Sequence, residues 1–295
     1  MMIAKKIVVK GIVQGVGFRP FIYKNATKNN LKGFVNNTSK GVFIEVEGYE
    51  EDITYFIDEI KHKPPVLSKV TDIKIIDKEI EGYTNFKIIE SKEEEEAITL
   101  LSPDIATCDD CLKDISDVNN RRYRYPFTNC TNCGPRFSIT KKVPYDRENT
   151  TMDVFQMCSE CREEYNDPLN RRFHAQPNGC SKCGPRVYIC NKEGNKIISN
   201  DPIKDIVKEI KNGKIVAIKG IGGFHLACDA KNKEVINELR KRKKRPRKPL
   251  AVMMRDIETV KKYCDVNELE ERILLGNKKP ILLLDKKRNS LLPKE

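Results

Sequence analysis

Eight cysteines in four Cys-x-x-Cys pairs have the spacing of two metal sites. The pairs are Cys108/Cys111, Cys130/Cys133, Cys158/Cys161 and Cys180/Cys183. Eighteen residues separate the pairs within each half, and every cysteine of the first half recurs fifty positions later. Two thiolates on one tight turn can share a metal, and a second pair about 15–20 residues on completes a tetrahedral shell of four sulfurs. We therefore predict two zinc ions with structural roles, because four protein ligands leave no open position for chemistry.

The two halves of this segment are copies of one unit. The Asn-Arg-Arg-Tyr of residues 120–123 recurs as Asn-Arg-Arg-Phe at 170–173, and Cys-Gly-Pro-Arg occurs at both 133–136 and 183–186. Four disulfides are the alternative, but disulfides belong to oxidising compartments. A redox-active pair is a further alternative, although a fourfold, evenly spaced set is not typical of one. The spacing leaves open whether each repeat binds its own zinc or whether the repeats exchange pairs.

A glycine loop near the start of the chain has the composition of an anion site. Residues 11–19 are Gly-Ile-Val-Gln-Gly-Val-Gly-Phe-Arg, and Pro20 is a plausible helix start. The glycines allow several backbone N–H groups to face one point, and a helix N-terminus behind them favours a phosphate-sized anion. Arg19 can donate to two phosphate oxygens. The residues alone indicate an anion site and no more.

The elements around this loop follow the order β-α-β-β-α-β. Hydrophobic periodicity predicts strands at 3–9, 31–36, 42–47, 70–76 and 86–89, and helices at 20–30 and 50–61. This order is that of the ferredoxin-like sandwich. We therefore expect an α+β multidomain protein whose first domain has this fold.

The first domain resembles the acylphosphatases. The resemblance rests on the loop of residues 11–19 and on Gly-Phe-Val-Asn-Asn at 33–37, followed by Gly41, and it covers residues 1–91. It implies that Asn37 orients the attacking water; without it, Asn37 would be interpreted as a turn residue. An acyl phosphate is already reactive, so charge neutralisation and water placement suffice. The resemblance also implies that the phosphoryl group is bound by the loop and its arginine, namely Gln14, Gly15, Val16, Gly17, Phe18 and Arg19.

Arginines interleaved with aromatic residues inside the cysteine repeats could bind nucleic acid. We expect instead that the aromatic side chains pack the small zinc cores and that the arginines lie over them. His174 takes the place of Arg124 in the first repeat, so we expect no ligand role for it. Cys190 has no partner in the pattern, and we expect it to be a buried small hydrophobic residue.

The last hundred residues read as an α/β segment with a strongly basic stretch. We expect helices at 201–211, 233–242 and 256–263, and strands at 215–218, 252–254 and 281–284. Eight of the nine residues from Arg240 to Lys248 are basic. A solvated face, a nucleic-acid patch and a pocket for polyphosphate are the three interpretations of such a run.

The repeats, in this order after the first domain, resemble the hydrogenase maturation carbamoyltransferases of the HypF family. Besides the cysteines, the resemblance rests on two short segments, Tyr-Pro-Phe-Thr-Asn-Cys at 125–130 and Arg-Phe-His-Ala-Gln-Pro at 172–177. The segment after them resembles the first part of the YrdC/Sua5-like domain, through Lys-Gly-x-Gly-Gly at 219–223 and the basic stretch at 243–250. This resemblance implies that ATP, accompanied by Mg²⁺, is held by Lys219, Lys243, Arg245 and Lys248.

By this resemblance the chain belongs to an enzyme. The first domain would hydrolyse carbamoyl phosphate, and the YrdC-like domain would join carbamate to ATP as carbamoyl adenylate. A further domain would transfer the carbamoyl group to the C-terminal cysteine of a HypE-like acceptor, for the cyanide ligands of [NiFe]-hydrogenase. We expect residues 200–295 to be a truncated YrdC-like domain, completed elsewhere. The alternatives are a stand-alone acylphosphatase, and an RNA-binding or tRNA-modification zinc protein that uses residues 240–248.

Length and composition limit the number of domains and the kinds of partner that the chain can have. It has 295 residues, of which 39% are hydrophobic and 33% charged, with no Trp and a net charge of +12. The length suits two or three domains, and the charge favours anionic partners. No apolar run approaches the ~20 residues of a membrane span, and the start alternates like a strand and not like a signal peptide. We expect a cytoplasmic protein without membrane or specific nucleic-acid partners. Its domains are predicted at 1–91, 108–190 and 200–295, with a linker at 92–107.

Overall fold

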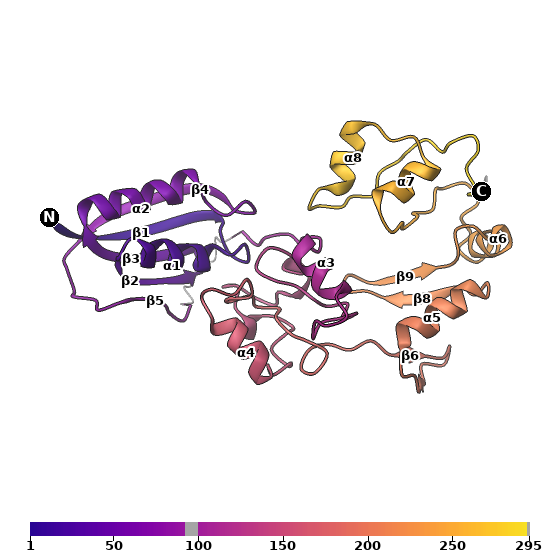
Figure 1. Ribbon diagram of the computed structural model, residues 1–295, viewed down its shortest axis with the longest axis horizontal. Helices are drawn as coiled ribbons and strands as arrows, with labels where there is room; N and C mark the ends of the chain where they lie inside the picture. The colour runs from indigo at the N-terminus through magenta and orange to yellow at the C-terminus, as the bar shows by residue number, and fades with distance from the viewer. Residues whose placement is uncertain (92–99, 294–295) are drawn as a thin grey trace. The chain divides into compact units, whose positions relative to one another are not determined.

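The structure is a computed structural model that describes residues 1–91 and 100–293. Half of the predicted linker, residues 92–99, lies outside the described residues. The chain forms two compact units, Met1–Pro185 and Arg186–Glu295, and each is considered by itself (Figure 1). None of the described helices is both long and apolar enough to cross a membrane.

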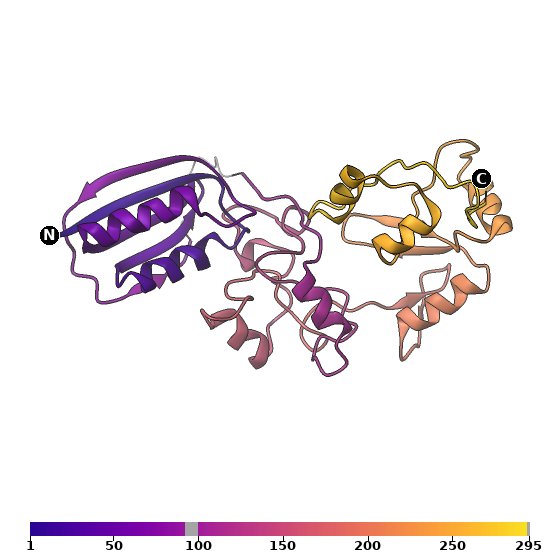
Figure 2. The same ribbon diagram turned by 45° about the horizontal axis from the view of Figure 1, so that its top comes forward.

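The first domain is a five-stranded sheet with two helices on one face. Its strands lie in the order β4-β1-β3-β2-β5, and β2 pairs parallel with β5 while the other pairings are antiparallel. The helices α1 and α2 lie along the same side of this sheet (Figures 1 and 2). The elements are β1 (Met2–Ile12), α1 (Phe18–Lys28), β2 (Lys32–Thr38), β3 (Gly41–Tyr49), α2 (Glu50–His62), β4 (Lys69–Lys78) and β5 (Phe86–Ile88).

Every element predicted for this domain is present within a few residues of its expected bounds. The core forms because alternate residues of a strand lie on the same face of the sheet, so the apolar side chains of Val42, Ile44 and Val46 in β3 share one face, and the apolar stripe of each helix covers that face. Ile22 of α1, Ile44 of β3 and Phe56 of α2 are fully buried in one cluster. The ferredoxin-like prediction is confirmed, and the sheet places the glycine loop between β1 and α1.

The cysteine repeats form small lobes with little regular structure. They contain α3 (Asp109–Ser116), α4 (Ser159–Asn166) and two short 3-10 turns, η1 (Phe137–Ile139) and η2 (Arg147–Asn149). Each helix begins directly after a cysteine, Cys108 or Cys158. The backbone repeats as well, because Arg124 and His174 both adopt positive φ, 55° and 53°.

The second unit contains short strands and helices. They are β6 (Ile189–Cys190), β7 (Lys196–Ile197), α5 (Pro202–Lys211), β8 (Val216–Lys219), β9 (Phe224–Ala227), α6 (Lys233–Arg242), α7 (Ile257–Tyr263) and α8 (Glu268–Leu275). Its described strands form two separate pairs, β6 with β7 and β8 with β9. Helix α8 was not predicted, although Asn267 and Glu270 form a capping box that marks its start.

Three expectations for the second unit were wrong. Residues 252–254 and 281–284 are not strands, because no strand among the described residues pairs with them and an apolar run without a ladder partner does not form a sheet. Met253 is 99% exposed. Cys190 is exposed and not buried; it lies on a two-residue strand that pairs with the equally short and exposed β7.

Replacing Gly33 by alanine is expected to destabilise the first domain by about 2 kcal/mol or more. Gly33 has φ +131°, and an added Cβ would lie 2.1 Å from the carbonyl oxygen of Glu45 on β3. Gly82→Ala is the matched control: its φ is +81°, but nothing lies within 4 Å of an added Cβ, so only backbone strain of about 1 kcal/mol is expected. Urea unfolding followed by circular dichroism measures both, and equal losses would contradict the steric argument.

Candidate functional site

The eight paired cysteines form two tetrahedral clusters, one in each repeat. Cys108, Cys111, Cys130 and Cys133 make the first, and Cys158, Cys161, Cys180 and Cys183 the second, with all sulfurs of a group within 4.8 Å of one another. Neighbouring Sγ atoms lie 3.7 and 3.8 Å apart in the first cluster and 3.6 to 3.8 Å apart in the second. Zinc–sulfur bonds of about 2.3 Å in a tetrahedron separate sulfurs by about 3.8 Å.

This geometry fits two zinc ions and answers the pairing question. A disulfide would bring two sulfurs to about 2.05 Å, whereas all the cysteines are free. Each repeat supplies its own four ligands, so the repeats do not exchange pairs. His174 belongs to neither cluster. Four sulfur ligands close each site, which suits a structural ion and not a catalytic one.

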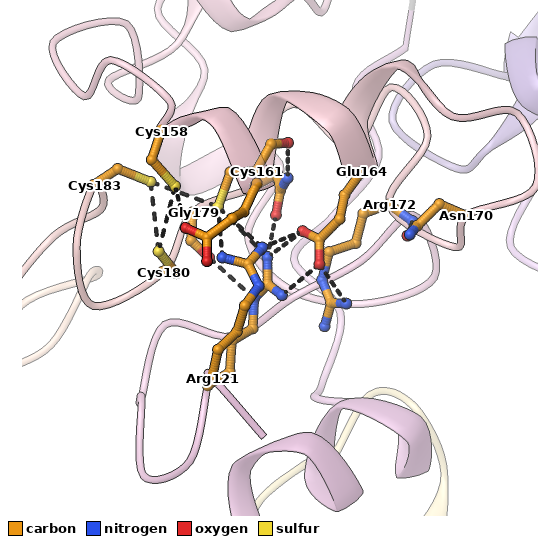
Figure 3. Close-up of polar contacts among 12 residues, drawn as sticks. Arg121, Cys158, Cys161, Glu164, Asn170, Arg172, Gly179, Cys180 and Cys183 are labelled. Atoms are coloured by element: carbon orange, nitrogen blue, oxygen red, sulfur yellow. Dashed lines mark hydrogen bonds and ion pairs between the residues drawn. The ribbon is translucent and has the colours of Figure 1, made fainter. Parts of the chain in front are cut away.

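Although the ligands stay within a repeat, the arginines beside them cross between repeats. Arg121 Nη1 and Nη2 lie 3.4 and 3.3 Å from Sγ of Cys161 in the second repeat, and Arg122 Nη1 donates to Glu164 at 2.8 Å. Figure 3 shows the Arg121 guanidinium directed at Cys161 and Glu164. Arg122 is 2% exposed.

Arginines of the second repeat make the equivalent contacts with the first repeat. Arg171 Nη1 lies 2.9 Å from Sγ of Cys111, and Arg171 and Arg172 both pair with Asp114 of α3. Asp114 is the counterpart of Glu164, which lies fifty residues further along the chain. Each repeat therefore supplies arginines that form ion pairs with an acidic residue of the other repeat. Guanidinium donors beside a sulfur offset the negative charge of a four-thiolate zinc site.

These contacts correct the expectation for the arginines of the repeats. Arg121, Arg122, Arg171 and Arg172 do not lie over aromatic cores with their charges in solvent; they are held in ion pairs between the repeats. Burial raises the pKa of the Glu164 carboxyl, but hydrogen bonds from Arg122 and Arg121 outweigh this and lower that pKa to about 2. Guanidiniums engaged in this way are not available to a nucleic-acid backbone.

The glycine loop forms one side of a pocket at the start of α1. Gly15 and Gly17 have φ values of 72° and 75°, which favour glycine and turn the loop back on itself. Gly17 is the N-cap of α1 and provides no side-chain cap, so the first backbone N–H groups of the helix remain available to an anion. The pocket is lined by Val13, Gln14, Gly15, Gly17, Phe18, Arg19, Pro20, Asn37, Thr131, Arg136, Tyr145, His174, Ala175 and Gln176.

The structure brings Arg19 and Asn37 together in this pocket. Both are buried, at 8% and 1% exposure. In one orientation of the side-chain amide, Asn37 Nδ2 lies 3.4 Å from the Tyr145 carbonyl oxygen. With amide oxygen and nitrogen exchanged, Oδ1 accepts from Arg19 Nη2 at 3.1 Å and Nε at 3.2 Å. Because arginine has only donors, the hydrogen-bond network favours the exchanged assignment.

The other side of the pocket belongs to the zinc region. Asp146 Oδ1 lies 2.7 Å from Arg19 Nη2, with both side chains mostly buried. The Tyr145 carbonyl oxygen accepts from the same Nη2 at 3.3 Å, and the Tyr145 N–H donates to Gln14 Oε1 at 2.9 Å. The Gln14 side chain thus joins the zinc region to the β2–β3 turn, because its Nε2 donates to the Thr38 carbonyl at 2.8 Å.

Arg136 joins the first zinc knuckle to the glycine loop. Its Nη2 donates to the carbonyls of Cys130 and Thr131, both at 3.0 Å, and its Nε donates to the carbonyl of Gly15. The side chain is buried at 2% exposure. The conformation of the loop is thus tied to the turn between two zinc ligands.

Sequence reasoning missed the zinc-region residues of this pocket. Tyr145 and Asp146 follow no repeat and carry no spacing signal. His174 offered one: it replaces arginine in an otherwise repeated stretch, and such divergence can mark a new role. Its ring packs against Tyr165 and Phe173 at centroid distances of 4.9 and 4.7 Å.

The residues predicted to hold ATP lie in the second unit. Lys219 ends β8, with its Nζ over the ring of Phe224 at 5.4 Å. Arg245 Nη2 donates to the Pro249 carbonyl at 2.7 Å, which curls the basic loop, while Lys243 and Lys248 are exposed. Among the described residues no hydrogen bond or ion pair joins Lys219 to this loop.

Comparisons with known families agree with this layout. Residues 5–88 match the family model Acylphosphatase, residues 107–140 and 157–190 match the HypF finger, and residues 208–295 match the Sua5/YciO/YrdC model described as Telomere recombination. The acylphosphatase of Bacillus licheniformis is 44% identical over 89 residues, which are 30% of this chain and 98% of that protein. The first domain therefore belongs to the acylphosphatase family.

Longer relatives cover nearly the whole chain. The probable carbamoyltransferase HypF of Methanocaldococcus jannaschii is 52% identical over 96% of this chain and 37% of its own length. A crystal structure of full-length HypF in the phosphate- and nucleotide-bound form is 54% identical, with a TM-score of 0.91 over 97% of this chain and 38% of that one. Over nearly its whole length the chain is thus similar to HypF proteins. It spans a little over a third of the length of these relatives.

Double substitutions are expected to separate the two clusters. Cys111→Ser with Cys133→Ser removes ligands of one repeat only, so one zinc per chain should remain. Cys111→Ser with Cys161→Ser breaks both clusters and should leave none, because a closed structural site does not hold zinc stably with three sulfurs. Elemental analysis of the purified variants gives the count, with Cys190→Ser as the control that keeps two. Loss of both ions in the first double variant would show that pairs are exchanged.

Arg122→Met is expected to destabilise the zinc region by about 3 kcal/mol, because it leaves a buried carboxylate with less charge compensation. Lys182→Met, which removes an exposed pair with Glu160 beside the same cluster, should cause no measurable change. Thermal unfolding of the zinc-loaded proteins compares the two. Similar melting temperatures for both variants would show that the ion pairs between the repeats add nothing to stability.

Proposed function

We propose that the first domain of this chain hydrolyses carbamoyl phosphate. The observation that carries the proposal is the meeting of Arg19 and Asn37, both buried, at a glycine loop that opens a helix. Water and carbamoyl phosphate give carbamate and inorganic phosphate: the water oxygen bonds to phosphorus, and the carbamate oxygen leaves with its electron pair.

Each residue has a distinct task in this step. Arg19 and the backbone N–H groups of residues 14–18 hold the phosphoryl oxygens and neutralise charge that spreads over them in the transition state. Asn37 is a neutral amide that can orient the attacking water beside Arg19. Asp146 holds the guanidinium through Nη2, and Asn37 accepts from Nη2 and Nε, so the Nη1 group of Arg19 remains for the phosphoryl group.

We propose in addition that the chain takes part in carbamoyl transfer. Its second unit would bind ATP, with Mg²⁺, through Lys219, Lys243, Arg245 and Lys248, and carbamate would attack ATP to give carbamoyl adenylate and pyrophosphate. The support is the match of residues 208–295 and the nucleotide named for the HypF structure. The acceptor would be the C-terminal cysteine of a HypE-like protein, on the route to the cyanide ligands of [NiFe]-hydrogenase.

This proposal assigns a task to each predicted domain. Residues 1–91 would carry hydrolysis, residues 108–190 the two zinc ions, and residues 200–295 the nucleotide, with 92–107 as a linker. Carbamate is short-lived in water, so hydrolysis and adenylation benefit from occurring in one protein. The free thiolates of the clusters suit the reducing cytoplasm.

Arg19→Ala is expected to lower kcat/KM for phosphate release from carbamoyl phosphate by about 10²–10³-fold, because the main charge-neutralising group is lost. Arg19→Lys should not restore the rate, since lysine lacks the planar fork. Asn37→Ala should lower kcat by a comparable factor with a smaller effect on KM. The measurement is a phosphate-release assay on zinc-loaded protein.

The controls for this assay are Arg162→Ala and Asn119→Ala, which remove exposed residues of the same types and should leave the rate unchanged. Undiminished phosphate release in Arg19→Ala would show that the glycine loop and Arg19 do not take part in the hydrolysis. Absence of phosphate release from the intact chain would show that the first domain does not hydrolyse carbamoyl phosphate.

A further inference from the structure

The pocket beside Arg19 has two sides of opposite hydrogen-bonding character. The loop side offers donors: the N–H groups at the start of α1 and the Arg19 guanidinium. The zinc-region side offers acceptors, the carbonyl oxygen of Tyr145 and the ring of His174. A ligand that fits both sides needs an acceptor-rich end and a donor-bearing end.

The His174 imidazole is held in the neutral form. Burial, and then the charge of Arg19, lower its pKa to about 3. A neutral imidazole always has one nitrogen that accepts a hydrogen bond. Within residues 1–91 and 100–293, no side chain or backbone group hydrogen-bonds to either ring nitrogen of His174, whose backbone carbonyl accepts from Gln176 Nε2 at 2.9 Å.

Gln176, which also lines the pocket, is engaged in the protein. Its Oε1 accepts from the Arg147 N–H at 2.8 Å and from the Tyr165 hydroxyl at 2.9 Å. Arg136 is likewise occupied by backbone carbonyls. Of the three side chains Gln176, Arg136 and His174, His174 is the one that retains hydrogen-bonding capacity toward a ligand.

We propose that His174 and the Tyr145 carbonyl receive the amino group of carbamoyl phosphate, so that the zinc region makes the site selective for carbamoyl over acetyl phosphate. This inference rests on the proposed function. The two substrates have nearly the same shape and differ in NH₂ against CH₃. A methyl group cannot donate, so acetyl phosphate would leave the acceptor nitrogen of the partly buried His174 ring without a hydrogen bond, and sites built to hydrogen-bond a substrate group discriminate strongly against an analogue that lacks it.

The stand-alone acylphosphatases provide a physical contrast. The Bacillus licheniformis protein is covered at 98% of its length by an 89-residue match, so it has no room for a counterpart of the zinc region. Its phosphate loop would face an acyl group without these two acceptors. Selectivity for the carbamoyl group is therefore a property that the zinc region adds to the fold.

The test compares kcat/KM for carbamoyl phosphate and acetyl phosphate in the zinc-loaded chain and its variants. His174→Phe keeps the aromatic packing against Tyr165 and Phe173 but removes the ring nitrogens. We expect kcat/KM for carbamoyl phosphate to fall by about tenfold or more while that for acetyl phosphate changes by less than about twofold. His174→Asn retains an acceptor and tolerates positive φ, so it should recover part of the preference. His62→Phe, on an exposed histidine of α2, is the control.

Several results would overturn the inference. Equal losses for both substrates in His174→Phe would make His174 a packing residue, and no preference in the unmodified chain would remove the selectivity itself. If neither substrate is hydrolysed by the unmodified chain, the proposed function fails and this inference with it. Zinc content and circular dichroism identify a misfolded variant; if His174→Phe does not fold, an unchanged substrate ratio in His174→Ala overturns the proposal.

Discussion

The buried guanidinium of Arg136 is the contact on which the phosphate loop depends. It donates to carbonyls between two zinc ligands, Cys130 and Cys133, and to the carbonyl of Gly15. A buried arginine must satisfy all its donors, and one that finds its acceptors in two different lobes couples their positions. Zinc, which touches no substrate in the proposed reaction, thereby determines the loop that does.

Compensation of buried charge also holds the two repeats together. Each cluster of four thiolates is negative, and each is flanked by arginines of the other repeat and by an acidic residue, Asp114 or Glu164, at equivalent positions. Neither repeat could bury this charge alone, since unpaired ions inside a protein are costly. Duplication solves the problem, because each copy supplies the cations that its partner lacks. These four arginines are therefore engaged inside the protein, whereas most basic residues of 240–248 are exposed.

The elements that could be predicted from sequence are those specified by local spacing. The sheet and helices of the first domain follow from signals such as the alternation along β3 and the apolar stripe of α2, and the clusters follow from the cysteine intervals. Arg19 and Asn37 were accessible because a family motif carries them. Tyr145 and Asp146 were not, since their place depends on how the zinc region packs on the loop. The strands expected at 252–254 and 281–284 failed for the same reason, because a strand exists only with a partner that sequence does not reveal.

Placing a zinc region over an acyl phosphate site changes the chemistry available there. In an open loop, water solvates the acyl end of the substrate, and donor or acceptor character at that end matters little. In the proposed complex Tyr145 and His174 face that end, so each polar atom would have to be matched, and the low dielectric would strengthen each match. The interaction of Asp146 with Arg19 has a related effect: a buried guanidinium paired with a carboxylate presents an oriented cation without the full cost of isolated charge. In this proposal the zinc region supplies both orientation and selection, while the phosphoryl chemistry stays with the loop.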